Sequence, residues 1–198
     1  MRLKNIKGAS EKILLGKYFI NNPNEYKGKW HELFKNNNPI YIEIGMGKGN
    51  FIIKNALTNP DINYIGIEMY DSVILRAVEK TNELELNNLY LIRMDARLIE
   101  EVFDKEIDLI YLNFSDPWPK DRHAKRRLTS PRFLARYDKI FKEYKGRDVS
   151  IEFIEMIGRI TGTKELVKLA DNGRKDKVVN MEMCNAMKEF LEGGRREG

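Results

Sequence analysis

The fold is decided by the stretch Glu43-Ile44-Gly45-Met46-Gly47-Lys48-Gly49, which continues the β-branched and aromatic run that begins at Ile40. The run predicts a short strand, and the glycines let the backbone turn sharply and approach a ligand closely. A dinucleotide fingerprint, G-x-G-x-x-G, would need glycine at Asn50, so the observed G-x-G-x-G spacing makes a dehydrogenase a distant alternative. The carboxylate of Glu43 is awkward for a pyrophosphate but suits a cationic ligand.

Strands and helices alternate outward from this turn. Apolar periodicity predicts helices over residues 50–59 and 71–86, the second capped by Asp71, and strands over residues 64–68, 89–94 and 107–114. The last strand is strongly apolar, as a central strand covered on both faces should be. This alternation predicts an α/β fold with right-handed crossovers, a mainly parallel sheet and helices on both faces.

Carboxylates stand at the ends of the four predicted strands, namely Glu43, Glu68, Asp95 and Asp116. In such a sheet, ligands bind beyond the carboxyl ends of the strands. Each acid alone could be a helix cap or a solvated loop residue. Together they suit a ligand with ribose, adenine and a positive charge, which describes S-adenosylmethionine, whereas they would repel the phosphates of NAD.

A stiff and then strongly basic segment follows the last of these acids. Pro117 and Pro119 restrict the loop, and Trp118 between them either stacks on a base or packs in the core. The run from Arg122 to Arg127 has a charge density suited to phosphates, although such a run can also be a solvated surface. The basic run directly follows the proline loop that begins at Asp116, and this position favours RNA binding over a merely solvated surface.

Charge is segregated along the 198 residues, whose net charge is +5. Residues 31–116 carry 8 Lys/Arg and 15 Asp/Glu, which gives −7, whereas residues 117–147 carry 11 and 3, which gives +8. This pattern indicates either a polyanionic partner or a solvated basic surface. The lone Cys184 excludes an internal disulfide, a zinc site is not expected, and no apolar run suggests a membrane span. We therefore expect a soluble cytoplasmic protein.

The segment Asp116–Leu128, reading D-P-W-P-K-D-R-H-A-K-R-R-L, resembles the signature of the bacterial tRNA (guanine-N(7)-)-methyltransferases. The glycine turn, Gly66-Ile67-Glu68 and Asp95-Ala96 fit that family in order and spacing, and the resemblance covers roughly residues 1–142. It implies a Rossmann-like, S-adenosylmethionine-dependent methyltransferase that methylates N7 of a guanine in the variable loop of tRNA. The resemblance also implies roles for individual residues: Asp116 as the catalytic acid, Lys120 at the substrate, Arg122, His123, Lys125, Arg126 and Arg127 at the RNA, and Glu43, Gly45, Gly47, Glu68, Asp95, Ala96 and Asp116 at the cofactor.

The last quarter of the chain does not follow the sequence pattern of that family. We expect one domain over residues 1–198, with a basic extension (1–39), a cofactor and catalytic core (40–142) and an atypical tail (143–198). Residues 149–154 could form a fifth strand, and residues 178–191 predict an amphipathic helix. The tail faintly resembles the carboxyl ends of mobile-element-associated nucleases. The alternative function is an impaired RNA- or cofactor-binding remnant with a foreign tail, and either a monomer or a homodimer fits the sequence.

Overall fold

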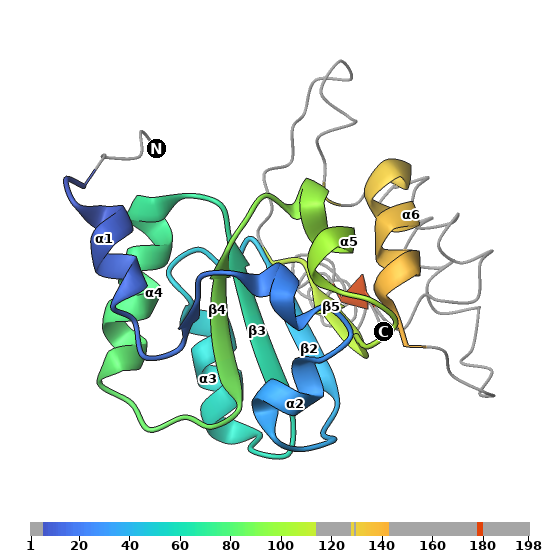
Figure 1. Ribbon diagram of the computed structural model, residues 1–198, viewed down its shortest axis with the longest axis horizontal. Coiled ribbons are helices and arrows are strands. Elements are labelled where there is room, and N and C mark those ends of the chain that lie inside the picture. The colour runs from blue at the N-terminus through green and yellow to red at the C-terminus, as the bar shows by residue number, and fades with distance from the viewer. Residues whose placement is uncertain (1–5, 114–127, 129, 143–177, 180–198) are drawn as a thin grey trace, which may run out of the picture.

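The computed structural model describes residues 6–113, 128, 130–142 and 178–179. They form a sheet in the order β1-β4-β3-β2-β5-β6, in which every pair of neighbouring strands is parallel (Figure 1). The strands are β1 (Phe19–Ile20), β2 (Ile40–Ile44), β3 (Asn63–Glu68), β4 (Leu89–Arg93), β5 (Leu109–Tyr111) and β6 (Val178–Val179). The helices are α1 (Ala9–Leu14), α2 (Trp30–Phe34), α3 (Asn50–Thr58), α4 (Asp71–Asn82), α5 (Ile99–Val102) and α6 (Pro131–Ile140), with short 3-10 turns η1 (Pro23–Tyr26) and η2 (Ala96–Leu98).

The chain order of the strands reverses at β2. From β2 the chain moves outward through β3 and β4, and it then returns to pair β5 with the other side of β2. This reversal is the topological switch point of a doubly wound sheet, where the connecting segments diverge and leave a crevice beyond the carboxyl ends of the strands. The predicted α/β fold with a mainly parallel sheet is therefore confirmed, and β2 and β5 flank the expected ligand crevice.

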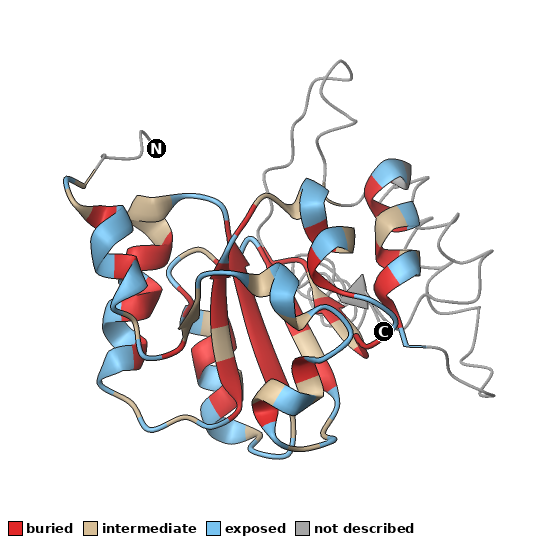
Figure 2. Ribbon diagram, viewed as in Figure 1, coloured by how far each residue is buried: buried red, intermediate tan, exposed pale blue. Residues whose placement is uncertain are grey.

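Two apolar clusters cover the two faces of the sheet. On one face α2, α5 and α6 pack on the strands through side chains such as Trp30, Phe103 and Tyr137. On the other face α1, α3 and α4 pack through side chains such as Ile13 and Ile52. Helices on both faces leave the central strands almost wholly buried, as Figure 2 shows. Among the described helices, none is both long enough and apolar enough to cross a membrane.

The predicted elements around the glycine turn agree closely with the structure, with three corrections. Asp71 is the first residue of α4 rather than its cap, because its carboxylate binds Arg93 and Ser10 instead of the helix N–H groups. The helix ends at Asn82, since the Tyr18 hydroxyl donates to Leu84 O and accepts from Leu86 N, both at 2.8 Å. Of the strand predicted over residues 107–114, the described part (107–113) is regular only over β5 and begins with an isolated bridge from Ile107 to Phe141.

The segment predicted as a basic extension contributes to the fold. β1 adds a strand to the outer side of β4, and the carbonyl of Tyr18 accepts from Leu91 N at 2.9 Å. In α2, the fully buried Trp30 donates from Nε1 to Val102 O at 3.0 Å. None of these elements is predicted by the local sequence pattern, because each is short and is stabilised by contacts with distant residues.

The predicted tail helix over residues 178–191 is wrong at its start. Val178 and Val179 form β6 and pair with Ile110 and Tyr111 of β5. Valine is a strong strand former, and β5 has unpaired backbone groups on that side, so pairing prevails over the local helical periodicity. The remainder of that prediction, and the strand predicted over residues 149–154, fall outside the described residues.

Candidate functional site

The glycine turn runs from the end of β2 to the start of α3. Gly45, Gly47 and Gly49 have φ angles of 77°, 60° and 73°, in the left-handed region that side chains disfavour. A Cβ placed on Gly47 would meet no atom of the described residues within 4 Å, whereas one on Gly45 would lie 4.0 Å from Leu128 Cδ1. The turn is therefore open above Gly47, and the end of the basic segment returns beside Gly45.

A second glycine lets this turn fold down onto the neighbouring strand. A Cβ on Gly66 of β3 would lie 2.3 Å from the sulfur of Met46, so any larger residue there would have to displace the Met46 side chain. Met46 is buried, and its N–H and that of Gly45 both donate to the carbonyl of Ile67. The turn is thus fixed to β3 as well as to β2.

Glu68 connects this turn to the end of β3. Its Oε2 accepts from Gly47 N at 3.1 Å, and its Oε1 accepts from Met69 N at 2.8 Å and Tyr70 N at 3.1 Å. The carboxylate is largely buried, and a carboxylate can accept about four hydrogen bonds. Glu68 therefore keeps acceptor capacity while it holds the turn in place.

Glu43 lies in β2 at the switch point, where it is paired in register with Tyr111 of β5. Its side chain is 2% exposed, and Oε1 accepts from Asn113 Nδ2 at 2.9 Å. Burial raises the pKa of Glu43 to about 7, against the opposing effects of Asn113 and of the Ile52 N–H, and the negative charge of Glu68 raises it further. The Ile52 N–H makes no hydrogen bond to Oε2, which has no partner among the described residues.

Asp95 lies two residues beyond β4 and is bound by its own loop. Its Oδ1 accepts from Arg97 N at 2.8 Å, and its Oδ2 accepts from the Arg97 guanidinium at 2.6 and 2.9 Å. These bonds to Arg97 lower the pKa of Asp95, and the Asp95 carboxylate caps η2, which begins at Ala96. The Arg97 side chain is 71% exposed, so it can move away from Oδ2 at little cost.

The structure thus brings Glu43, Glu68 and Asp95 to one edge of the sheet, as predicted from the sequence, because β2, β3 and β4 are adjacent and parallel. The remaining predicted residues lie outside the described part of the chain: Asp116, Lys120, Arg122, His123, Lys125, Arg126 and Arg127. The described residues that flank them are nevertheless placed at this edge, since Asn113 binds Glu43 and Leu128 lies beside Gly45.

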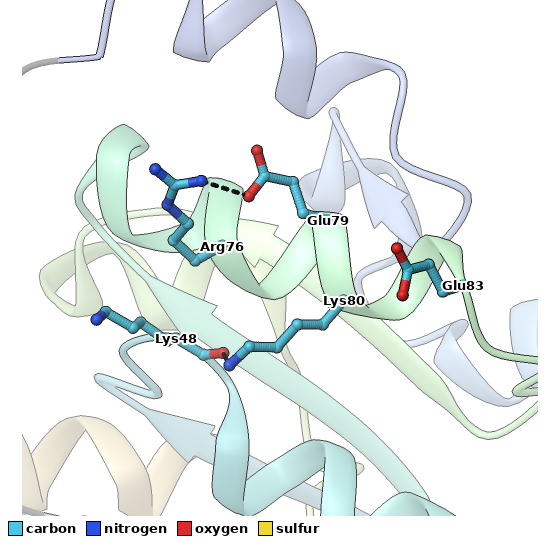
Figure 3. Close-up of a pocket in the computed structure, with 5 residues that line it drawn as sticks. All are labelled: Lys48, Arg76, Glu79, Lys80 and Glu83. Carbon is cyan, nitrogen blue, oxygen red and sulfur yellow. Dashed lines mark hydrogen bonds and ion pairs between the residues drawn. The ribbon is translucent and has the colours of Figure 1, made fainter.

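A shallow pocket of about 240 Å³ lies on the outer side of the glycine turn, between the turn and α4 (Figure 3). It is lined by Lys48, Arg76, Glu79, Lys80 and Glu83. Lys80 Nζ reaches across it to Lys48 O at 3.0 Å and to Asn50 Oδ1, while Arg76 pairs with Glu79 at 2.7 Å (Figure 3). None of the three carboxylates lines this pocket, and the bonds of Lys80 across it join α4 to the glycine turn.

The sequence did not lead us to Asn113 or Lys80 as parts of this region, nor to the close contact that Gly66 makes with Met46. Asn113 could have been noticed, because it is a polar residue that directly follows the apolar run from Leu109 to Leu112. Gly66 inside an otherwise apolar strand was a signal of close backbone approach. Nothing in the local sequence distinguishes Lys80 from the other exposed lysines.

A doubly wound sheet with a glycine turn and strand-end carboxylates is typical of proteins that bind nucleoside-type ligands at the switch point. Residues 37–146 match the family described as "Putative methyltransferase", so the chain belongs to this methyltransferase family. The Rossmann-like methyltransferase fold predicted from the sequence is thereby confirmed.

Within that family, the chain is similar to curated proteins of one kind. A tRNA (guanine-N(7)-)-methyltransferase of Lachnoclostridium phytofermentans is 63% identical over 139 residues, which are 70% of this chain and 65% of that protein. One from Listeria innocua is 59% identical over 123 residues, 62% of this chain and 58% of that protein. The chain therefore spans less than two thirds of the length of these relatives. A solved antibiotic-related methyltransferase aligns with 58% of each chain at 20% identity and a TM-score of 0.47.

Proposed function

We propose that this protein transfers a methyl group from S-adenosylmethionine to N7 of a guanine in the variable loop of tRNA. The observation that carries the proposal is the switch-point site itself. The turn and the acids Glu43, Glu68 and Asp95 stand at one edge of the sheet, where Asn113 and Leu128 flank the segment that holds Asp116 and the basic run. The relatives named above support the substrate.

The described residues fit the cofactor on three independent points. The turn is open above Gly47, which leaves room for a ligand close to the backbone. Glu68, at the end of the second strand outward from the switch point, already accepts three of the about four hydrogen bonds that a carboxylate can accept, so it has capacity left for a ribose hydroxyl. The buried Glu43 lacks a cationic partner among the described residues, so a positively charged ligand would compensate its charge.

The proposed cofactor set is the one predicted from the sequence: Glu43, Gly45, Gly47, Glu68, Asp95, Ala96 and Asp116. In this proposal Asp95 accepts a hydrogen bond from the adenine amino group. The Arg97 guanidinium then gives up one of its hydrogen bonds to Asp95 Oδ2. The set falls within residues 40–142, which we assign as the cofactor and catalytic core of a single domain.

When bound, S-adenosylmethionine supplies an electrophilic methyl group on a positively charged sulfur. Guanine N7 carries a lone pair and no proton, so no residue has to act as a general base before the transfer. The protein must instead orient the base, and positioning of this kind is worth up to roughly 7–11 kcal/mol. We assign this task to Asp116, whose carboxylate would also offset the positive charge that methylation places on the base. Lys120 contacts the substrate, and Arg122, His123, Lys125, Arg126 and Arg127 bind the RNA.

The test is transfer of a labelled methyl group to bulk tRNA, followed by nucleoside analysis. We expect 7-methylguanosine in the product and a loss of at least roughly 100-fold in turnover for Asp116→Ala. Cofactor binding without any methyl transfer would instead support the cofactor-binding remnant. Full turnover by Asp116→Ala would remove Asp116 from the catalytic role.

A further inference from the structure

A second group of charged side chains surrounds the shallow pocket between the glycine turn and α4, outside the site of the three carboxylates (Figure 3). All five residues that line it are charged and exposed, and they comprise three cations and two carboxylates, a balance of +1. Sites for small molecules are mostly apolar and enclose their ligands. An open pocket with a wholly charged lining suits instead a charged group that projects from a larger molecule.

The positive charges of this pocket are only partly compensated. Arg76 pairs with Glu79 at 2.7 Å, whereas neither Lys48 nor Lys80 forms an ion pair with any described residue. Lys80 uses two of its three N–H donors on Lys48 O and Asn50 Oδ1, and the Lys48 ammonium makes no hydrogen bond within the described part of the chain. The first turn of α3, which begins beside them, contains no acidic residue. The pocket therefore offers N–H donors and positive charge to an anion.

Lys48 separates the anion-binding end of the pocket from the bond that holds the turn. Its main-chain carbonyl accepts from Lys80, whereas its side chain extends the other way, to the end of the pocket where Arg76 lies (Figure 3). Glu83 lies at the opposite end (Figure 3). The Arg76 guanidinium has five N–H donors, and the bond to Glu79 leaves most of them available. An ammonium and a guanidinium at one end can both donate to the oxygens of one phosphate.

The pocket borders the edge of the sheet where the proposed reaction takes place. Lys48 directly follows Gly47, whose N–H binds Glu68 at the end of β3. Earlier in the same turn, Gly45 has Leu128 beside it, which directly follows the basic run. The glycine turn therefore lies between the end of the basic segment and the pocket, and an RNA chain bound by that segment has only this turn to cross.

We propose that the pocket binds a backbone phosphate of the tRNA, with Lys48 and Arg76 as the donors. The identity of the RNA rests on the proposed function, to which the pocket adds a contact on the outer side of the glycine turn. A phosphate contact carries no sequence information, but it fixes the register and orientation of the nucleic acid. Lys48 and Arg76 thus hold the RNA backbone while the guanine is presented to the methyl group.

Lys48→Met tests the contact, because it removes the ammonium and keeps the main-chain carbonyl that binds Lys80. Lys54→Met is the matched control, since it removes an exposed lysine of α3 that does not line the pocket. We would measure tRNA binding by the full chain through fluorescence anisotropy, between about 50 and 200 mM salt. Lys48→Met should weaken binding by roughly 3- to 10-fold and lower the salt slope by about 1, while Lys54→Met leaves the slope unchanged.

A change of the opposite sign gives a second readout. Glu83→Gln removes a negative charge from the pocket, so it should tighten tRNA binding by roughly two- to threefold, a gain that damage to the fold would not produce. Equal losses for Lys48→Met and Lys54→Met, or an unchanged slope for Lys48→Met, would overturn the proposal.

Three further outcomes are distinguishable. If Lys48→Met weakens S-adenosylmethionine as much as tRNA, the residue acts on the turn and the phosphate contact is rejected. If it weakens binding of inorganic phosphate but not of tRNA, the pocket takes a small anion and the proposal is wrong. If the wild-type protein binds no tRNA, the proposed function and this contact are rejected together, whereas normal tRNA binding by Lys48→Met rejects the contact alone.

Discussion

Gly49 of the glycine turn and Ala77 of α4 are in direct contact, because a Cβ on Gly49 would lie 2.9 Å from the Cβ of Ala77. We predict that Gly49→Ala lowers the free energy of unfolding by roughly 3 kcal/mol or more, through this clash and the left-handed φ of 73°. Gly47→Ala is the matched control, since its φ is 60° but its Cβ would meet no described atom within 4 Å. It should cost only about 1–2 kcal/mol in urea unfolding, and equal costs would contradict the close contact.

The buried Glu43 should make the ligand-free protein less stable as the pH rises. Its pKa is raised from 4.5 to about 7 on folding, so the folded state binds more protons than the unfolded state between these values. The stabilisation is complete below pH 4.5 and is lost as the pH rises through 7, by an amount of up to roughly 3 kcal/mol.

Glu43→Gln removes this titration and should remove the corresponding slope from a series of urea-unfolding curves between pH 5 and 8. Glu100→Gln is a useful comparison, because ion pairs with Arg136 and Lys139 lower rather than raise the pKa of Glu100. If the slope remains in Glu43→Gln, the pH dependence of the free energy of unfolding comes from groups other than Glu43.

Lys80 should act on ligand affinity through the glycine turn. Its ammonium is bound to Lys48 O and Asn50 Oδ1, and Lys48 directly follows Gly47, whose N–H binds Glu68. Lys80→Met should raise the dissociation constant for S-adenosylmethionine by roughly 3- to 10-fold and leave the melting temperature almost unchanged, since the side chain is exposed.

Lys54→Met provides the control for Lys80, because Lys54 is an exposed lysine on the neighbouring helix α3. It should bind the cofactor normally. In a double-mutant cycle, Lys80→Met and Asn50→Ala should be non-additive in binding. Additive effects would mean that the Lys80–Asn50 bond does not transmit the change.

The hydroxyl of Tyr18 should contribute measurably to stability. It bridges Leu84 O and Leu86 N, which joins the segment before β1 to the loop after α4. Tyr18→Phe should lower the free energy of unfolding by about 1–2 kcal/mol without changing cofactor affinity. An unchanged urea midpoint would show that the amino-terminal segment is not fixed by this contact.

The strands of the core and three acids of the site were predictable because each leaves a local signal. β2 and β3 are short β-branched runs, and an acid at the end of adjacent parallel strands must share an edge with its neighbours. The amino-terminal strand β1 left no such signal, since two residues have no usable periodicity. The Glu43–Asn113 pair could not be predicted from spacing, because the residues are 70 positions apart and meet only through the register of β2 and β5.

The short strand β1 also has a consequence for solubility. It occupies the outer side of β4 through the pairs Phe19–Leu91 and Ile20–Ile92, in the middle of a strand that is otherwise buried and apolar. An unprotected strand of this composition would offer its backbone groups to a second molecule and seed edge-to-edge aggregation. The amino-terminal segment that carries β1 therefore protects the outer edge of β4. A chain shortened beyond Ile20 would expose the backbone groups of β4 and should aggregate more readily.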